Sequence, residues 1–297
     1  MKVLLNDGLS PNGLKILENA GIEYDKNHYE PTELVEKIGE FDGILVRSAT
    51  KVTKEVIDAG VNLKAIARAG TGIDNIEHKY ASTKGIQVLN TPGANSASVS
   101  ELVFGHFFAL ARFIPEANRT MALGEWNKKK FKGFELAGKT VGIVGFGRIG
   151  QITARMALAF GMKVMAFDVN DIKTDMDVKA VTKEELLKEA DFISIHVPKL
   201  DKPFIAAEEL KMMKKSAYIV NCSRGGVVEE KALLEALNNG EIAGAGLDVW
   251  ENEPNPNLEL VKHPKVSATC HIGANTHDAL DRVGIQIAEK MVAELIN

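Results

Sequence analysis

Three turns in the C-terminal half of this chain place reactive side chains directly after apolar runs. They are Arg224 in NCSRGG, Glu253 in LDVWENEP and His271 in TCHIGANT. Imidazole changes its charge near neutral pH, so His271 suits a general base or acid, and a glutamate bonded to its second ring nitrogen would fix the tautomer. A guanidinium offers planar donors for a carboxylate and for a developing carbonyl oxygen. Together these groups would suit proton transfer on a substrate that carries a carboxylate.

Each of the three residues has a simpler interpretation when it is taken alone. A histidine before a glycine turn is commonly a surface or capping group, an arginine can belong to a structural ion pair, and a glutamate before proline can be a loop acid. Their joint occurrence favours the catalytic interpretation, because ligands bind beyond the carboxyl ends of the strands in open α/β sheets.

The run GFGRIG, with Gly145, Gly147 and Gly150, predicts a dinucleotide site. It follows the apolar stretch TVGIV and precedes the helix-like QITARMALAF. In such a turn the first glycine permits the tight bend, the second lets the main chain approach a pyrophosphate, and the third lets the helix pack on the strand. The phosphates then bind at the helix N-terminus.

Asp168 ends the next strand-like segment, MKVMAFD, 18 residues after Gly150. A carboxylate at this distance accepts hydrogen bonds from the ribose hydroxyls of an adenosine. Val169 and Asn170 follow it without a cation to meet a 2′-phosphate, so the sequence favours NAD over NADP. The alternative is an acid that only caps the turn at the strand end.

The composition is ordinary for a globular protein. With 297 residues, 45% hydrophobic and 26% charged, the chain is long enough for about two domains. A net charge of −4 predicts neither a nucleic-acid nor a membrane partner. The N-terminal MKVLLNDG is too short for a signal peptide, and residues 99–114 are too few and too interrupted for a membrane span. Two cysteines, Cys222 and Cys270, predict free thiols, no metal site and a cytoplasmic protein.

Strand-like and helix-like segments alternate along the chain. This order predicts an α/β fold of two parallel-sheet domains, Rossmann-like or flavodoxin-like, with an interdomain cleft. Residues 1–93 would form the substrate domain, completed by the helical stretch 278–297. Residues 94–277 would form the NAD-binding Rossmann domain, with six strands in TVGIV, KVMAF, FISIHV, AYIVNCS, AGAGLDV and KVSATC.

With the glycine turn, the spacing of 29 residues from Arg224 to Glu253 and 18 from there to His271 resembles the D-2-hydroxyacid dehydrogenase family. VRSATKVT, RAGTGIDN, LNTPG and WNKKKF resemble its 3-phosphoglycerate dehydrogenase branch. The resemblance implies NAD-dependent oxidation of D-3-phosphoglycerate to 3-phosphohydroxypyruvate, the first step of the phosphorylated route to serine. The alternatives are a reductase of glyoxylate, hydroxypyruvate or another 2-oxo acid and, from a different class, an NADH-sensing binding protein.

The same resemblance implies a larger set of residues around the cofactor. The set is Thr71, Gly145, Gly147, Arg148, Ile149, Gly150, Asp168, His196, Val197, Pro198, Cys222, Ser223, Asp248, Gly273 and Ala274. Two positions depart from the family pattern. Cys270 replaces a common proline before the histidine, and Val197 replaces a threonine that can bond the cofactor.

Substrate-binding residues are expected in the first domain and on one basic segment. The resemblance implies that Ala69 and Gly70 hold the substrate carboxylate through backbone donors. A phosphorylated substrate also needs cations away from that carboxylate, and Arg47, Arg68 and Lys128 are the candidates. The alternative for the run 128–130 is a solvated group of charges.

The helix-like stretch 96–114 is apolar on nearly all sides, so it must be buried. Its apolar members are Val99, Leu102, Val103, Phe104, Phe107, Phe108, Leu110, Phe113 and Ile114. We predict that this helix meets a second subunit about a two-fold axis, which gives a homodimer. Because the chain ends at Asn297, no serine-binding regulatory domain is expected after it.

Overall fold

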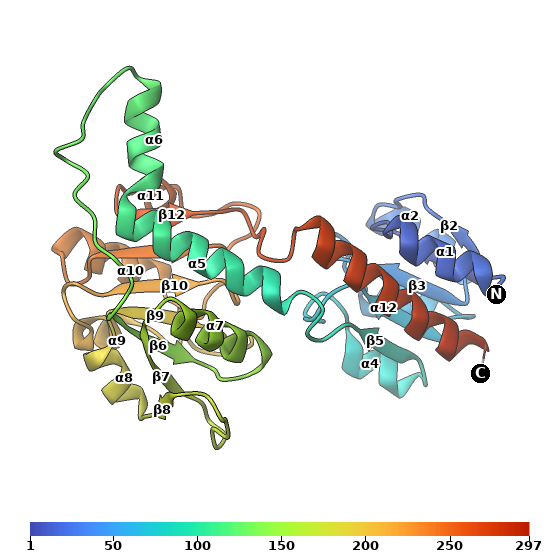
Figure 1. The fold of residues 1–297 in the computed structure, drawn as a ribbon. Helices are drawn as coiled ribbons and strands as arrows, with labels where there is room; N and C mark the ends of the chain where they lie inside the picture. Colours follow the sequence, from blue (N-terminus) through green and yellow to red (C-terminus); the bar gives the residue numbers. More distant parts are fainter. Residues whose placement is uncertain (297) are drawn as a thin grey trace. The chain divides into compact units, whose positions relative to one another are not determined.

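The computed structural model describes residues 1–296, which divide into two compact α/β units. Unit 1 contains residues 1–95 together with the segment that begins at Asn275, and unit 2 contains Ser96–Ala274. Each unit is built on its own parallel sheet (Figure 1).

Unit 1 has a five-stranded sheet with the order β2-β1-β3-β4-β5, in which all neighbours are parallel. Its elements are β1 (Lys2–Leu5), α1 (Pro11–Asn19), β2 (Glu23–Asp25), α2 (Pro31–Lys37), η1 (Ile38–Glu40), β3 (Gly43–Val46), α3 (Lys54–Ala59), β4 (Ala65–Arg68), α4 (His78–Thr83), β5 (Gln87–Asn90) and α12 (His277–Ile296). This is the flavodoxin-like order, with its switch point between β1 and β3.

The central strands β1, β3 and β4 of unit 1 are mostly apolar on both faces because helices cover both faces of the sheet. In β1, Val3 and Leu5 pack on the side of α1 and α12, whereas Leu4 packs with α2 and α3 on the other. Helices α1 and α12 lie side by side, so the C-terminal segment completes the core that the first strand begins (Figure 1).

Unit 2 has a seven-stranded parallel sheet with the order β12-β11-β10-β9-β6-β7-β8. Its elements are α5 (Ser96–Arg112), α6 (Ile114–Ala122), β6 (Thr140–Val144), α7 (Arg148–Ala159), β7 (Lys163–Phe167), β8 (Val178–Ala180), α8 (Lys183–Glu189), β9 (Phe192–Ile195), α9 (Ala207–Met212), β10 (Tyr218–Asn221), α10 (Glu230–Asn239), β11 (Gly244–Leu247), α11 (Leu258–Lys262) and β12 (Val266–Ala268). The order is that of a Rossmann domain with its switch point between β6 and β9. The predicted class, an α/β fold with two parallel-sheet domains, is confirmed.

Three short elements are additions to the predicted set. The edge strand β2 has the sequence EYD, the edge strand β8 has VKA, and α2 has only seven residues. Strand β8 raises the strands of unit 2 from the predicted six to seven. Edge strands of three partly exposed residues lack the apolar run by which a buried strand is found in a sequence.

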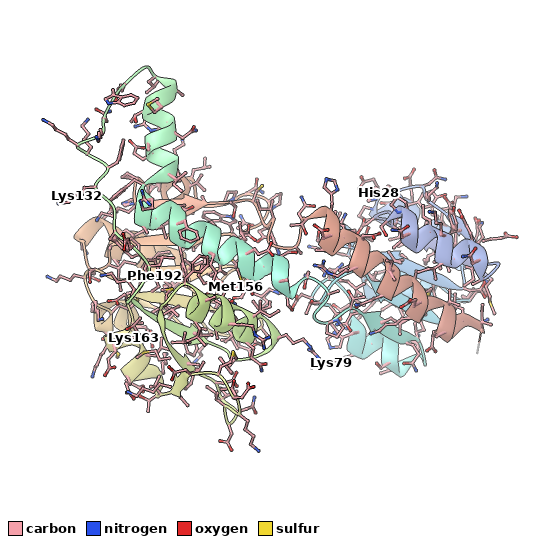
Figure 2. All side chains as sticks on the ribbon, viewed as in Figure 1. His28, Lys79, Lys132, Met156, Lys163 and Phe192 are labelled. Carbon is pink, nitrogen blue, oxygen red and sulfur yellow. The ribbon has the colours of Figure 1, made fainter. Side chains whose placement is uncertain are left out.

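The predicted helix 96–114 is interrupted, which corrects one expectation. Helix α5 ends at Arg112, Phe113 takes a left-handed backbone with φ of 56°, and Ile114 begins α6 with its side chain 53% exposed. The apolar face of α5 packs within unit 2 against α7 and β11. Figure 2 shows Phe192 in the interior that this helix covers, and Lys132 on the coil after α6.

No single helix within residues 1–296 is long and apolar enough to cross a membrane. Only α5 and α6 taken together reach that length and composition, and they are bent by 64°.

Candidate active site

The glycine turn follows β6 at the switch point of unit 2. Gly145 has φ of 89°, and a Cβ there would lie 2.6 Å from the carbonyl oxygen of His196, so only glycine fits. A Cβ at Gly150 would overlap the carbonyl oxygen of Gly145. A Cβ at Gly147 would meet nothing within 4 Å, and no side chain caps α7 there. The turn therefore leaves an open space at a helix N-terminus, which fits a pyrophosphate.

Asp168 stands at the end of β7 and faces this turn. Its Oδ2 accepts a hydrogen bond from the N–H of Phe146 at 2.7 Å, and its Oδ1 accepts one from the N–H of Asn170 at 2.9 Å. Burial raises the pKa of Asp168, but these backbone donors outweigh it, so the pKa lies below its ordinary value. The carboxylate is thus charged, caps its own turn and carries lone pairs for ribose hydroxyls. Both interpretations of this residue are compatible with the structure.

The segment after β9 lies beside the glycine turn, where the carbonyl oxygen of His196 approaches Gly145. His196 is partly buried, and its Nε2 lies 2.9 Å from the hydroxyl of Ser194. Its Nδ1 is buried and has no hydrogen-bond partner in the described part of the chain. Burial lowers the pKa of His196 to about 3, so the ring is neutral. Val197 is partly buried and Pro198 exposed beside it.

His271 and Glu253 form a hydrogen-bonded pair in unit 2. Nδ1 of His271 lies 2.7 Å from Oε2 of Glu253. Oε1 of Glu253 accepts a hydrogen bond from the N–H of Trp250 at 3.1 Å, which orients the carboxylate. Because Nδ1 is engaged, Nε2 is the ring nitrogen that remains for a substrate, and the His271 side chain is 44% exposed.

His271 has φ of 55°, a left-handed backbone that is uncommon outside glycine. The buried Asp248 holds this conformation by accepting hydrogen bonds from residues 269–273, here called the histidine loop. Its Oδ1 accepts from the Thr269 hydroxyl at 2.6 Å and from the Ile272 N–H at 2.8 Å.

Two further bonds complete this attachment. Oδ2 of Asp248 accepts from the N–H of Gly273 at 2.9 Å, and the backbone oxygen of Asp248 accepts from the N–H of His271 at 2.7 Å. Strained backbone persists where surrounding contacts over-determine it, as these do. The resemblance implied that Asp248 lines the cofactor groove, and the structure shows its carboxylate bonded to the histidine loop.

Arg224 follows β10 on the same edge of the sheet. Its NH1 donates to the carbonyl oxygen of Ser223 at 2.8 Å, and its own carbonyl accepts from the Asn221 side chain at 2.9 Å. Burial raises the pKa of the neighbouring Cys222 thiol well above its ordinary value, and the Asp248 carboxylate acts in the same direction. Cys222 is thus a neutral packing residue of the groove wall.

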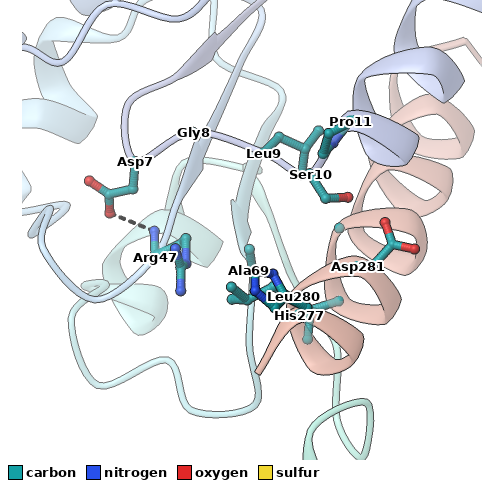
Figure 3. A pocket seen from close by; sticks show the side chains of 12 residues that line it. Asp7, Gly8, Leu9, Ser10, Pro11, Arg47, Ala69, His277, Leu280 and Asp281 are labelled. Carbon is teal, nitrogen blue, oxygen red and sulfur yellow. Dashed lines mark hydrogen bonds between the residues drawn. The ribbon is translucent and has the colours of Figure 1, made fainter. Parts of the chain in front are cut away.

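Arg47 follows β3 in unit 1, and the Asp7 carboxylate holds its turn. Oδ2 of Asp7 accepts from the N–H groups of Arg47 and Thr50 at 2.6 and 3.1 Å, and Oδ1 accepts from the Thr50 hydroxyl at 2.6 Å. Figure 3 shows the first of these bonds beside the Arg47 side chain.

A cavity of about 500 Å³ lies within unit 1 at the switch point of its sheet (Figure 3). Its lining consists of Asp7, Gly8, Leu9, Ser10, Pro11, Arg47, Ala69, His277, Leu280, Asp281, Val283 and Gly284. The structure therefore brings Arg47 and Ala69 to one cavity, and its volume suits a small polar ligand.

The amides of Ala69 and Gly70, predicted to hold the substrate carboxylate, make hydrogen bonds within unit 1. The N–H of Ala69 donates to the carbonyl oxygen of Val46, next to the end of β3, and that of Gly70 donates to the carbonyl oxygen of Arg68 in a local turn, both at 2.8 Å. A Cβ at Gly70 would overlap the guanidinium of Arg68, which explains the glycine.

Thr71, predicted for the cofactor, and Lys128, predicted for the substrate, are not part of the cavity lining. The hydroxyl of Thr71 donates to the Asn95 side chain at 2.9 Å. Lys128 is exposed on the coil after α6 in unit 2, and within residues 1–296 no ion pair joins it to a carboxylate.

Three partners of the predicted residues were missed from the sequence. Asp7, Thr269 and His106 make their contacts across long sequence separations, such as 43 residues from Thr50 to Asp7 and 163 from Thr269 to His106. The only signal for Asp7 is its place directly after the first apolar run.

A dinucleotide turn at the switch point and a histidine–carboxylate pair on the same sheet define a nicotinamide-dependent dehydrogenase. Comparison with known proteins gives the family. Residues 104–273 match the D-isomer specific 2-hydroxyacid dehydrogenase, NAD binding domain, and the chain belongs to this family. The predicted family and the predicted NAD cofactor are confirmed.

The similar proteins differ in their substrates. Hydroxypyruvate reductase of Thermotoga maritima is 47% identical over 99% of this chain and 98% of its own length. D-3-phosphoglycerate dehydrogenase of Methanocaldococcus jannaschii is 45% identical over 98% of this chain, which spans only 57% of that protein. A crystal structure of a Thermus thermophilus protein has a TM-score of 0.93 at 33% identity, covering 100% of this chain and 97% of that one.

Proposed function

We propose that the protein oxidises D-3-phosphoglycerate to 3-phosphohydroxypyruvate with NAD, the first step of the phosphorylated route to serine. The observation that carries the choice of substrate is Arg47 on the wall of the unit 1 cavity, where a cation can bind a phosphoryl group.

His271 is the proposed general base. With Nδ1 held by Glu253 at 2.7 Å, Nε2 takes the proton of the C2 hydroxyl, and Glu253 stabilises the imidazolium that forms. A bound NAD would supply the acceptor for the hydride that leaves C2. In the reverse direction His271 returns the proton to the carbonyl oxygen. Glu253 also keeps the ring at a fixed angle, because Trp250 fixes the carboxylate.

Arg224 is proposed to bind the substrate carboxylate and to polarise the C2 oxygen. A planar guanidinium can donate to both groups at once. Gly147 and the first turn of α7 would hold the pyrophosphate, and Asp168 the adenosine ribose, which carries no 2′-phosphate in NAD.

Replacing Arg47 tests the phosphate assignment. Arg47→Ala should raise KM for 3-phosphoglycerate about tenfold to a hundredfold, because it removes charge-assisted hydrogen bonds. KM for an unphosphorylated hydroxy acid should change far less. The matched control is Lys51→Ala, which removes an exposed cation four positions further along the chain. Equal effects of Arg47→Ala on both substrates would remove the phosphate assignment.

The second candidate is the reduction of hydroxypyruvate or glyoxylate. It is supported by the similarity to hydroxypyruvate reductase over nearly the full length of both proteins. Steady-state kcat/KM across 3-phosphoglycerate, hydroxypyruvate, glyoxylate and D-lactate distinguishes the two, because loop residues around one pocket decide substrate in a shared scaffold. No absorbance change at 340 nm with any of them would favour an NADH-sensing protein instead.

We further propose a homodimer that associates through α6 rather than α5. Ile114, Met121, Leu123 and Trp126 are 53 to 80% exposed, and a patch of this kind is typical of an interface. Figure 1 shows α6 extending beyond the sheet of unit 2. Trp126→Lys should lower the sedimentation mass toward 32.3 kDa, whereas Val61→Lys, at an isolated exposed apolar site, should not. A wild-type mass of a single chain would contradict the proposal.

We also propose that this enzyme is located in the cytoplasm. Cys222 and Cys270 are free thiols, as expected of a protein in a reducing compartment. Fractionation of the source cells would test this location.

A further inference from the structure

A buried histidine lies behind the histidine loop and has no place in the proposed reaction. His106 is on α5 and is only 2% exposed. Its Nδ1 lies 2.9 Å from the hydroxyl of Ser267, and its Nε2 lies 3.3 Å from the hydroxyl of Thr269. Gly246 on β11 makes room for it, because a Cβ there would lie 2.8 Å from Cβ of His106. The ring is thus fitted to this position between helix and sheet.

The hydrogen bonds around His106 have one consistent direction. Thr269 has a single hydroxyl proton and donates it to Oδ1 of Asp248 at 2.6 Å. Toward His106 the Thr269 oxygen can therefore only accept, so Nε2 carries the ring proton. Nδ1 of a neutral ring then accepts from Ser267. Burial lowers the pKa of His106 despite the opposing charge of Asp248, which agrees with a neutral ring.

The chain of bonds continues from Asp248 to the reacting imidazole. The same Oδ1 that accepts from Thr269 also accepts from the N–H of Ile272 at 2.8 Å. Rotation of the Asp248 carboxylate would break this bond together with the one from Gly273. Both amides belong to the histidine loop, in which His271 keeps its left-handed backbone.

We propose that His106 is a positioning residue for His271, acting through Thr269 and Asp248. The Nε2–H of His106 fixes the Thr269 hydroxyl so that its proton points at Asp248. The carboxylate is then held in the one orientation that satisfies the amides of the histidine loop. The catalytic consequence rests on the function proposed above, whereas the order of the loop does not.

The experiment compares His106→Met, which fills the space without a donor, with His106→Gln, whose amide can still donate to Thr269. His106→Met should lower kcat about tenfold to a hundredfold, since small displacements of a reacting group have effects of that size. The dissociation constant of NADH, measured by fluorescence, should change less than about threefold. His106→Gln should recover most of kcat. The matched control is Phe104→Leu, which weakens packing on another side of α5 and should leave kcat within about twofold.

Amide hydrogen exchange of the histidine loop provides a readout independent of activity. Ile272 and Gly273 should exchange at least tenfold faster in His106→Met than in the wild type or in Phe104→Leu. If His106→Met does not fold, Thr269→Val removes the same link without changing the side-chain shape, and Thr269→Ser should restore it. Unchanged exchange and unchanged kcat in these variants would overturn the proposal. A wild type that turns over no hydroxy acid would instead remove the proposed function, and the exchange comparison would still decide the role of His106.

Discussion

The two units fix their functional loops by the same local device. In unit 1, Asp7 follows β1 and accepts two backbone N–H groups and the Thr50 hydroxyl, at 2.6 Å, from the loop that carries Arg47. In unit 2, Asp248 follows β11 and accepts two backbone N–H groups and the Thr269 hydroxyl, also at 2.6 Å. Each aspartate thus ties the loop after a neighbouring strand to its own strand end.

The two aspartates, Asp7 and Asp248, differ in the exposure of the histidine that lies next to each of them. Beside Asp7 stands His28, whose side chain is 48% exposed and whose Nδ1 lies 3.7 Å from the carboxylate. Behind Asp248 stands His106, which is 2% exposed. The loop proposed to do chemistry is therefore fixed from the interior, and the loop proposed to select the substrate borders an open cavity. The similar proteins fit this difference, because a hydroxypyruvate reductase and a phosphoglycerate dehydrogenase are similar to this chain at nearly the same identity. Substrate choice can therefore change while the reaction loop stays fixed.

The largest effect that distinguishes the two devices is expected from Asp248→Asn. The amide nitrogen replaces one acceptor by a donor, so at least one bond to Thr269, Ile272 or Gly273 is lost. We expect kcat to fall about a hundredfold, because the histidine loop loses the orientation that the reaction needs. Stopped-flow measurement of NADH formation at saturating substrate gives this value.

The counterpart in unit 1 is Asp7→Asn, for which a smaller effect of another kind is expected. The turn at Arg47 loosens, so KM for the phosphorylated substrate should rise about tenfold while kcat stays within about threefold. If both variants reduced kcat equally with unchanged KM, the division of work between the two loops would be wrong.

The features that could be predicted from the sequence are those that depend on residues close together in the chain. The turn at Gly145 could be predicted because three glycines, a buried strand and a helix lie within about twenty residues. Arg224 and His271 each stand three residues after the end of an apolar strand, whereas Glu253 stands six residues after the end of β11. The interruption at Phe113 could not be predicted, because the apolar run continues through it. The role of His106 could not either, since a histidine in an apolar helix does not reveal that Ser267 lies opposite it, 161 residues away. Contacts of this separation depend on how the helix packs on the sheet.

Low pH should lower the stability of unit 2 more than that of unit 1. The effect is expected to be smaller than those of the aspartate variants, but measurable. The histidines whose pKa burial lowers, His106, His196 and His263, all lie in unit 2 of the described chain. For His196 the folded pKa of about 3 lies below its ordinary 6.5. As pH falls below 6.5, the unfolded chain binds a proton there that the folded unit does not. The stability is thus fully present above pH 6.5 and is lost as pH falls toward 3, by up to about 1.4 kcal/mol per pH unit for one histidine.

Both tryptophans, Trp126 and Trp250, belong to unit 2, so their fluorescence during urea unfolding reports this unit alone. Between pH 7.5 and 5 the urea midpoint of that signal should fall, although Glu230, whose pKa burial raises, opposes the change. His196→Gln removes one titrating group and should flatten the dependence, whereas His28→Gln in unit 1 should leave it unchanged. Hydrogen exchange of unit 1 peptides over the same pH range measures the stability of unit 1, which should change less than that of unit 2. A midpoint that falls equally in His196→Gln would mean that other titrating groups, rather than His196, set the acid limit of unit 2.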